Sequence, residues 1–151
     1  MIRSEGGCER RVYQVDVRVE VALALIEKDG RWLVSRRSAG RVFAGLWEFP
    51  GGKVHPGESA AGAAVREAAE ETGLAVEATA DLGSVETAHG GRIVVLRLVR
   101  CRPACGVDDA RPADPAITEV RWVSLAELAA LPMPPANGEI IRRLGPPGSD
   151  E

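Results

Sequence analysis

The sequence has few cysteines, no excess of basic residues and no apolar run long enough to cross a membrane. Its net charge of −3 argues against a basic face, so we expect no stable binding to nucleic acid. The N-terminus has no signal-peptide core. We therefore expect a cytoplasmic protein that does not associate with membranes.

The three cysteines are Cys8, Cys101 and Cys105. An odd number without a paired framework is typical of a reducing compartment rather than of a secreted disulfide scaffold. Cys101 and Cys105 have the spacing of half a metal site, but no second pair accompanies them and both histidines lie far away in the sequence. We interpret these two cysteines as incidental to function.

A chain of 151 residues with 45% hydrophobic residues is long enough to bury one core. The sequence contains no internal repeat and leaves no room for a second domain, so we predict a single domain over residues 1–151. Its two ends, residues 1–10 and 145–151, have the polar or Gly- and Pro-rich composition of loose tails, and we expect both to be flexible.

Alternating and continuous apolar positions predict strands between residues 15 and 26 and over residues 31–37, 46–49, 80–87, 92–101 and 120–123. Lys28-Asp29-Gly30 predicts a hairpin turn, and Pro50-Gly51-Gly52 predicts another turn. Helices are predicted over residues 59–72, after Ser124, and over residues 138–144. Strands interleaved with helices indicate an α/β sandwich with a mixed β-sheet.

Three glutamates, Glu67, Glu70 and Glu71, stand at positions i, i+3 and i+4 of the predicted helix and share one face. Two like charges ~4 Å apart repel by roughly 4 kcal/mol at an effective dielectric constant near 20. A cation among the carboxylates would remove this repulsion, and hard oxygen ligands favour Mg²⁺, with Mn²⁺ as a substitute. The alternative is a solvated acidic helix face.

The glutamates belong to a longer pattern that decides between these two interpretations. The pattern G-x5-E-x7-R-E-U-x-E-E-x-G-U, where U is aliphatic, is matched by Gly52, Glu58, Arg66, Glu67, Glu70, Glu71, Gly73 and Leu74, with Ala68 at the first U. The segment resembles the signature of the Nudix hydrolase superfamily. This resemblance implies the same α/β/α sandwich and the metal-dependent hydrolysis of a nucleoside diphosphate linked to another group.

The resemblance also implies roles for individual residues. Glu70 and Glu71 would bind the metal, and Glu67 would be either a further ligand or the base for the attacking water. The carbonyl oxygen of Gly51 is a further expected ligand, because a glycine pair lets the backbone approach an ion. Arg66 would hold the carboxylates in place.

Similarity outside the signature extends over residues 17–144 and resembles the MutT branch of the superfamily, which acts on 8-oxo-dGTP. The Pro134-Pro135-Ala136-Asn137 tetrad carries most of this information. By resemblance, Asn137 reads the oxidised guanine, because one amide can both donate and accept and so pair with O6 and the protonated N7. The alternative role for Asn137 is to cap the following helix.

Other residues around the signature are expected to bind the nucleotide. Glu48 and Phe49 would line the base pocket, and Arg37 would reach the nucleotide. Arg36 and Arg37 alternate along a strand, so only one of them can face the site. Lys53 is placed to meet phosphate, although an exposed lysine at the end of a loop is an equally good interpretation.

Two positions depart from the resembled enzymes. An additional metal-binding glutamate of those enzymes falls on Ala116, and the candidates to replace it are Asp114 and Glu119. The predicted hairpin turn His89-Gly90-Gly91 lacks the aromatic residue that would stack on a purine. The tryptophans Trp47 and Trp122 are expected in the core rather than in stacking positions.

The sequence leaves three functions open. The first is hydrolysis of 8-oxo-dGTP to 8-oxo-dGMP and pyrophosphate, which would cleanse the nucleotide pool and prevent mutation. The second is pyrophosphohydrolysis of another nucleotide, such as CTP or dCTP. The third is a non-catalytic module that binds nucleotide without Mg²⁺. The protein would act on its small-molecule substrate as a monomer or a homodimer.

Overall fold

The computed structural model describes residues 17–41, 43–105 and 109–144. The predicted flexible ends, and the start of the first predicted strand at Val15, lie outside the described residues. The elements are β1 (Val17–Lys28), β2 (Arg31–Arg37), β3 (Trp47–Glu48), β4 (Gly51–Lys53), α2 (Ala60–Thr72), β5 (Val76–His89), β6 (Arg92–Pro103), β7 (Ile117–Val123), α3 (Leu125–Ala130) and α4 (Asn137–Leu144).

The strands form one mixed sheet with the order β3-β2-β1-β6-β5, in which β4 also pairs with β1 and β7 with β2. Strands β1 and β6 are parallel, and the other pairs are antiparallel. The predicted turn between β1 and β2 is confirmed: Asp29 and Gly30 both have positive φ, 52° and 78°, as a tight hairpin turn requires.

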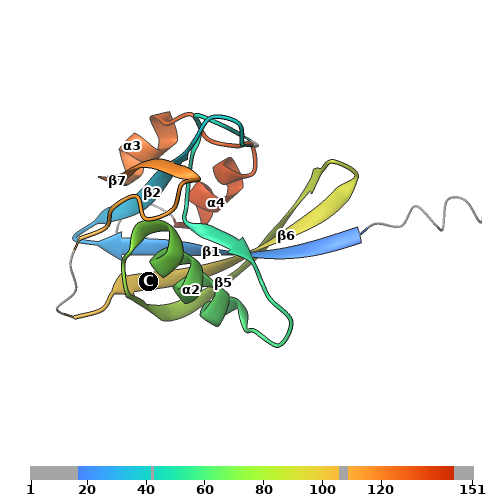
Figure 1. The fold of residues 1–151 in the computed structure, drawn as a ribbon, viewed down its shortest axis with the longest axis horizontal. Helices are drawn as coiled ribbons and strands as arrows, with labels where there is room; N and C mark the ends of the chain where they lie inside the picture. The colour runs from blue at the N-terminus through green and yellow to red at the C-terminus, as the bar shows by residue number, and fades with distance from the viewer. Residues whose placement is uncertain (1–16, 42, 106–108, 145–151) are drawn as a thin grey trace, which may run out of the picture.

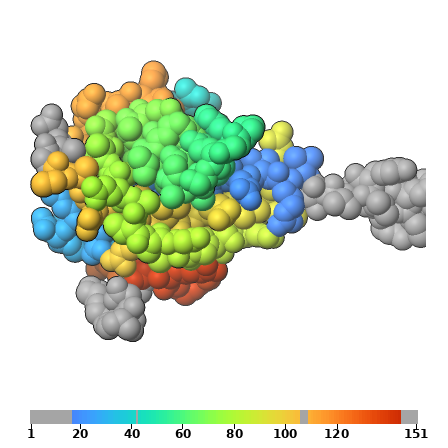
Figure 2. Space-filling view, turned by 90° about the horizontal axis from the view of Figure 1, so that it is seen from below, coloured from blue at the N-terminus to red at the C-terminus, as the bar shows by residue number. Residues whose placement is uncertain are grey.

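Helices cover both faces of the sheet (Figure 1). Apolar residues of β1 alternate between the two faces, which explains why Ala22 to Ile26 read as a continuous apolar run. Ala22, Ala24 and Ile26 pack with the alanines of α2, whereas Leu23 and Leu25 pack with α3 and α4. In the space-filling view, β5 and β6 form a band between the green helix α2 and the red helix α4 (Figure 2). The predicted α/β sandwich with a mixed sheet is confirmed.

The helix that carries the glutamates has the predicted bounds because both ends have strong local signals. The Ser59 hydroxyl accepts a hydrogen bond from the Gly62 N–H at 2.9 Å and caps the N-terminus. Gly73 ends the helix with φ 71°, a left-handed conformation that glycine adopts without strain. Small side chains at Ala63, Ala64 and Ala68 are fully buried, so α2 lies close to the sheet.

Two parts of the sheet differ from the prediction. Gly51 and Gly52, expected to form a turn with the preceding proline, belong instead to strand β4, which pairs antiparallel with β1. Strand β5 is longer than expected at both ends, β6 continues to Pro103, and the start of β1 runs beside their hairpin (Figure 1). Much of β5 is exposed, so its ends carry no apolar alternation that a sequence pattern could detect.

The tryptophans lie in the core, as the sequence predicts. Trp47 is buried in the α3–α4 side of the core, and Trp122 packs against the α2 side while its indole N–H donates to Asp109 at 3.0 Å. Cys101 is buried, and burial raises the pKa of its thiol to about 11. Within the part of the chain that the structure describes, no helix is long and apolar enough to span a membrane.

Candidate active site

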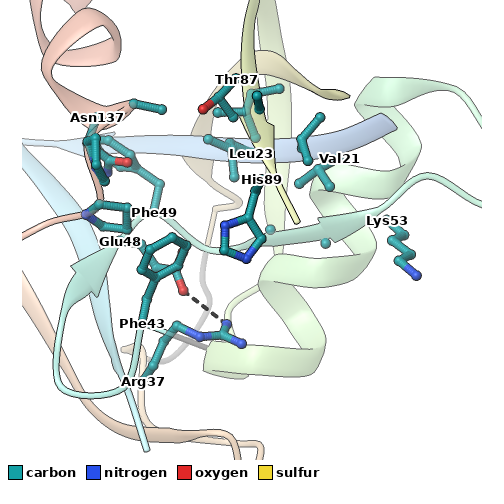
Figure 3. Close-up of a pocket in the computed structure, with 18 residues that line it drawn as sticks. Val21, Leu23, Arg37, Phe43, Glu48, Phe49, Lys53, Thr87, His89 and Asn137 are labelled. Atoms are coloured by element: carbon teal, nitrogen blue, oxygen red, sulfur yellow. Dashed lines mark hydrogen bonds and ion pairs between the residues drawn. The ribbon is translucent and has the colours of Figure 1, made fainter. Parts of the chain in front are cut away.

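A cavity of about 460 Å³ opens between the middle of the sheet, the β5–β6 hairpin and the start of α4 (Figure 3). Strand β1 contributes Val21 and Leu23, and the hairpin contributes Thr87, His89 and Leu96. The remaining polar or aromatic lining side chains include Arg37, Phe43, Glu48, Phe49, Lys53 and Asn137. A largely apolar cavity with a few polar groups is typical of a small-molecule site.

An ion pair joins two of the predicted binding residues inside this cavity. Arg37 Nη1 donates to Glu48 Oε2 at 2.9 Å, and both side chains are about one quarter exposed (Figure 3). Burial raises the pKa of Glu48, although Arg37 opposes the shift. Arg36 instead donates to the Gly45 carbonyl at 3.2 Å, so of the two arginines it is Arg37 that faces the cavity.

Asn137 lies at one end of the cavity and is only 5% exposed. It is the first residue of α4, and its side-chain amide donates to Met133 Sδ at 3.8 Å, a soft and weak acceptor. Asn137 lines the cavity, and it lies within α4 rather than at the position before the helix. Phe49, which the sequence predicts to line the base pocket, is 1% exposed and lines the same cavity.

At the other end, Gly51, Gly52 and Lys53 of β4 connect the cavity to the glutamates of α2. A Cβ at Gly52 would lie 2.3 Å from Glu67 Oε2, so only glycine leaves room for that carboxylate. The Gly51 N–H donates to Glu71 Oε1 at 3.3 Å. Strand β4 therefore contacts two of the three glutamates directly.

Arg66 holds several groups of the glutamate cluster together. Its guanidinium donates to Glu58 at 2.8 and 3.0 Å, to Glu67 at 2.9 Å, to Glu70 at 3.3 Å and to the Lys53 carbonyl at 3.0 Å. The hydrogen bonds from Arg66 and from the His55 backbone lower the pKa of Glu58 to about 2. Glu58 is thus a fixed anion that orients Arg66 toward the carboxylates.

Glu71 is the most perturbed of the three glutamates. Burial, and next the negative charge of Glu67, raise its pKa to about 8. A nearby divalent cation would offset both effects, because it favours the ionised carboxylate. The oxygen-only donor set of Glu67, Glu70, Glu71 and the Gly51 carbonyl therefore fits a hard cation in its chemistry.

The side chains are not already arranged around an ion. Among residues 17–41, 43–105 and 109–144, no three acidic, histidine or cysteine side chains converge closely enough to hold a metal. Glu67 and Glu70 are turned toward Arg66 instead. Both carboxylates lie at the ends of flexible side chains, so rotation of these side chains would be part of metal binding.

The two residues proposed to replace the glutamate expected at Ala116 have different surroundings. Glu119 is engaged with Arg36 and Arg121 at 4.0 and 3.4 Å. Asp114 is half-buried and follows Ala113, whose N–H donates to the Glu71 carbonyl at 2.9 Å. Of the two candidates, Asp114 is therefore the one whose loop is attached to the end of α2 that carries the glutamates.

The structure brings the predicted binding residues around one cavity and the predicted metal-binding residues beside it. Sequence reasoning missed Phe43, which belongs to the irregular segment before β3 and has no periodic pattern around it. It also treated His89 only as a missing aromatic. The two rings in fact lie together, with centroids 5.3 Å apart.

Comparison with known proteins agrees with this arrangement. The sequence matches the NUDIX domain family over residues 16–144. It is 36% identical to the CTP pyrophosphohydrolase of Escherichia coli K12 over 79% of this chain and 85% of that protein. It is 29% identical to the 8-oxo-dGTP diphosphatase of the same bacterium, over 84% and 96%. The MutT protein structure from Methanosarcina mazei Go1 has a TM-score of 0.74 and 28% identity, over 85% of this chain and 94% of that chain.

Proposed function

Because the chain belongs to the NUDIX family of hydrolases, we propose that it hydrolyses 8-oxo-dGTP to 8-oxo-dGMP and pyrophosphate with the help of Mg²⁺. The observation that carries the proposal is the position of Asn137. Its amide lies at one end of the cavity, and the glycine strand beside the glutamates lies at the other. A nucleotide can therefore place its base at Asn137 and its phosphates at β4.

In this proposal, Glu67, Glu70, Glu71 and the Gly51 carbonyl hold Mg²⁺, which supplies charge neutralisation and a lowered pKa of bound water. Glu67 is also the candidate to accept the proton of the water that attacks phosphorus. Arg66 holds Glu67 and Glu70 beside the proposed metal site through its hydrogen bonds, and both carboxylates would turn toward the ion when it binds. Together these groups would reduce the electrostatic repulsion that opposes attack of water on the phosphoanhydride.

The cationic side chains of the cavity bind the rest of the nucleotide. Lys53 is exposed at the end of β4 and is directed away from Asn137 in Figure 3, where it would meet the phosphates. Arg37 is fixed by Glu48 and would reach the nucleotide from the cavity wall. Asn137 would accept from N7–H of the oxidised guanine, whereas the normal base offers no proton there.

A second candidate is a CTP or dCTP pyrophosphohydrolase, favoured by the 36% identity to the Escherichia coli CTP enzyme. It uses the same glutamates and the same cavity, and only the base contacts differ. A non-catalytic module is the third candidate. The complete signature with its Arg66 network favours catalysis over this alternative.

We further propose a cytoplasmic enzyme, monomeric or homodimeric, that protects DNA by removing damaged nucleotides.

The test is pyrophosphate release from 8-oxo-dGTP, dGTP, dCTP and CTP, each with Mg²⁺, with Mn²⁺ and with EDTA. The proposal expects the highest kcat/KM for 8-oxo-dGTP and no turnover in EDTA. A higher kcat/KM for a cytosine nucleotide would replace the first candidate with the second. Nucleotide binding without any metal-dependent turnover would support the non-catalytic module.

A specific prediction concerns Asn137→Ala. We expect the ratio of kcat/KM for 8-oxo-dGTP to that for dGTP to fall by roughly 10-fold or more, because the amide that matches the oxidised base is removed. Turnover of dGTP should change little. The matched control is Thr87→Ala, which shortens another side chain of the cavity. If Asn137→Ala lowers both rates equally, Asn137 does not select the base.

A further inference from the structure

Phe43 and His89 meet across the cavity from two separate segments. Phe43 belongs to the segment between β2 and β3, and His89 ends β5 at the hairpin turn. Their ring centroids are 5.3 Å apart and the planes are tilted by 43°. Both residues line the cavity, and the labelled rings are drawn together between Asn137 and Lys53 (Figure 3).

Phe43 has an unusual backbone for a large side chain. Its φ of 61° lies in the left-handed region, which bulky residues rarely adopt. The Phe43 carbonyl accepts from the Leu46 N–H at 3.1 Å, so a local turn holds this conformation. Phe43 is nevertheless 37% exposed as a residue, so the core covers it only in part. Such strain is typical of positions that clamp a ligand.

The rings also have the freedom that a clamp needs. A planar base between them requires a separation of roughly 7–8 Å, which is two layers of van der Waals contact. The present 5.3 Å must therefore increase by rotation of the side chains. His89 is exposed, and nothing lies within 4 Å of where a Cβ would be at its neighbours Gly90 and Gly91. Both rings can thus move without disturbing the core.

We propose that Phe43 and His89 form a stacking clamp that holds the base of the nucleotide between their rings. This inference rests on the proposed nucleotide substrate and deepens it. Phosphates bound near Lys53 and a base directed at Asn137 place the planar part of the ligand at these rings. Stacking uses the face of the base, whereas Asn137 uses its edge, so the clamp provides affinity and Asn137 provides selectivity.

The test is calorimetric binding of 8-oxo-dGMP and CMP, with Mg²⁺–pyrophosphate as a ligand that has no base. The variants are Phe43→Ala, His89→Ala and the double variant, with Phe43→Tyr as the conservative control that keeps a ring. Removing either ring should raise Kd for both nucleotides by roughly 5- to 150-fold, the range expected for one base–aromatic stack. Affinity for Mg²⁺–pyrophosphate should not change, and Phe43→Tyr should bind nucleotides normally.

Three results would overturn the clamp: unchanged nucleotide affinity in Phe43→Ala, equal weakening of nucleotide and pyrophosphate binding, or loss of affinity in Phe43→Tyr equal to that in Phe43→Ala. Thermal unfolding of each variant distinguishes lost stacking from lost folding. The clamp and the proposed substrate can fail separately. A wild-type enzyme that prefers CTP keeps the clamp, whereas an 8-oxo-dGTPase that is insensitive to Phe43→Ala loses only the clamp.

Discussion

The Glu71→Gln variant is expected to turn nucleotide over more than about 100-fold more slowly than the wild-type enzyme while remaining folded. Glutamine keeps the size of the side chain but cannot carry the negative charge that a hard cation prefers. Glu70→Gln should show a similar loss, because it removes a second carboxylate of the same cluster. The measurement is kcat with saturating Mg²⁺, together with metal affinity by titration.

The same substitution is expected to change stability in the opposite direction when no metal is present. The pKa of Glu71 is raised from 4.5 to about 8 in the folded protein. Between these pH values, the folded state keeps a proton that the unfolded state has released, so stability falls as pH rises. Glu71→Gln removes this penalty, so in EDTA at pH 8 it should raise the free energy of unfolding by up to about a few kcal/mol. The unfolding temperature should rise with it.

The control for this prediction is Glu77→Gln, which changes an exposed carboxylate on β5 that pairs with Arg102 at 3.0 Å. It should alter neither kcat nor the pH dependence of stability. Near-normal turnover in both Glu70→Gln and Glu71→Gln would contradict the metal assignment. A metal-free Glu71→Gln protein that is less stable than the wild type at pH 8 would show that Glu71 makes a structural contact as a carboxylate.

The helix with the glutamates was predictable because its signals are local. A serine cap, a terminal Gly73 and a fixed spacing of charges all lie within one short segment. The turn at Asp29 and Gly30 was predictable for the same reason. Such features need no knowledge of what the segment packs against.

The missed features depend on distant partners. Strand β4 has no apolar alternation, and it is a strand only because Gly51 and Gly52 can approach β1 and Glu67. Phe43 and His89 are 46 positions apart in a region without periodicity, and only the fold brings their rings together. The family resemblance supplied roles for Arg37, Glu48 and Asn137, but it supplied no role for Phe43.

The second large effect is expected from alanine at the two adjacent glycines of β4. A Cβ at Gly51 would lie 2.3 Å from the Ala22 carbonyl oxygen and 3.0 Å from Leu23 Cα, both in the backbone of β1. Because the backbone of a central strand cannot move aside, Gly51→Ala should destabilise the protein by about 3 kcal/mol or more. That corresponds to a decrease in Tm of roughly 6–12 °C.

Gly52→Ala should instead reduce activity with little loss of stability. The three atoms nearest to its Cβ would be those of the Glu67 carboxylate, at 2.3 to 2.8 Å, and this carboxylate is the end of a flexible side chain. Glu67 can rotate away, but the added methyl group then keeps its carboxylate from the space beside β4 where metal and water are proposed to bind. We expect kcat to fall by roughly 10- to 100-fold, the usual effect of a misplaced catalytic group.

The two variants therefore separate the structural from the chemical use of the glycine pair. Gly62→Ala is the matched control, since its Cβ would be 3.2 Å from the Ser59 hydroxyl oxygen, which has to shift by only a few tenths of an ångström, and alanine favours a helix. Thermal unfolding and kcat are measured for all three proteins. Equal Tm values for Gly51→Ala and Gly52→Ala would mean that β1 yields to the added methyl group. A normal kcat in Gly52→Ala would mean that the position of Glu67 beside β4 has no part in catalysis.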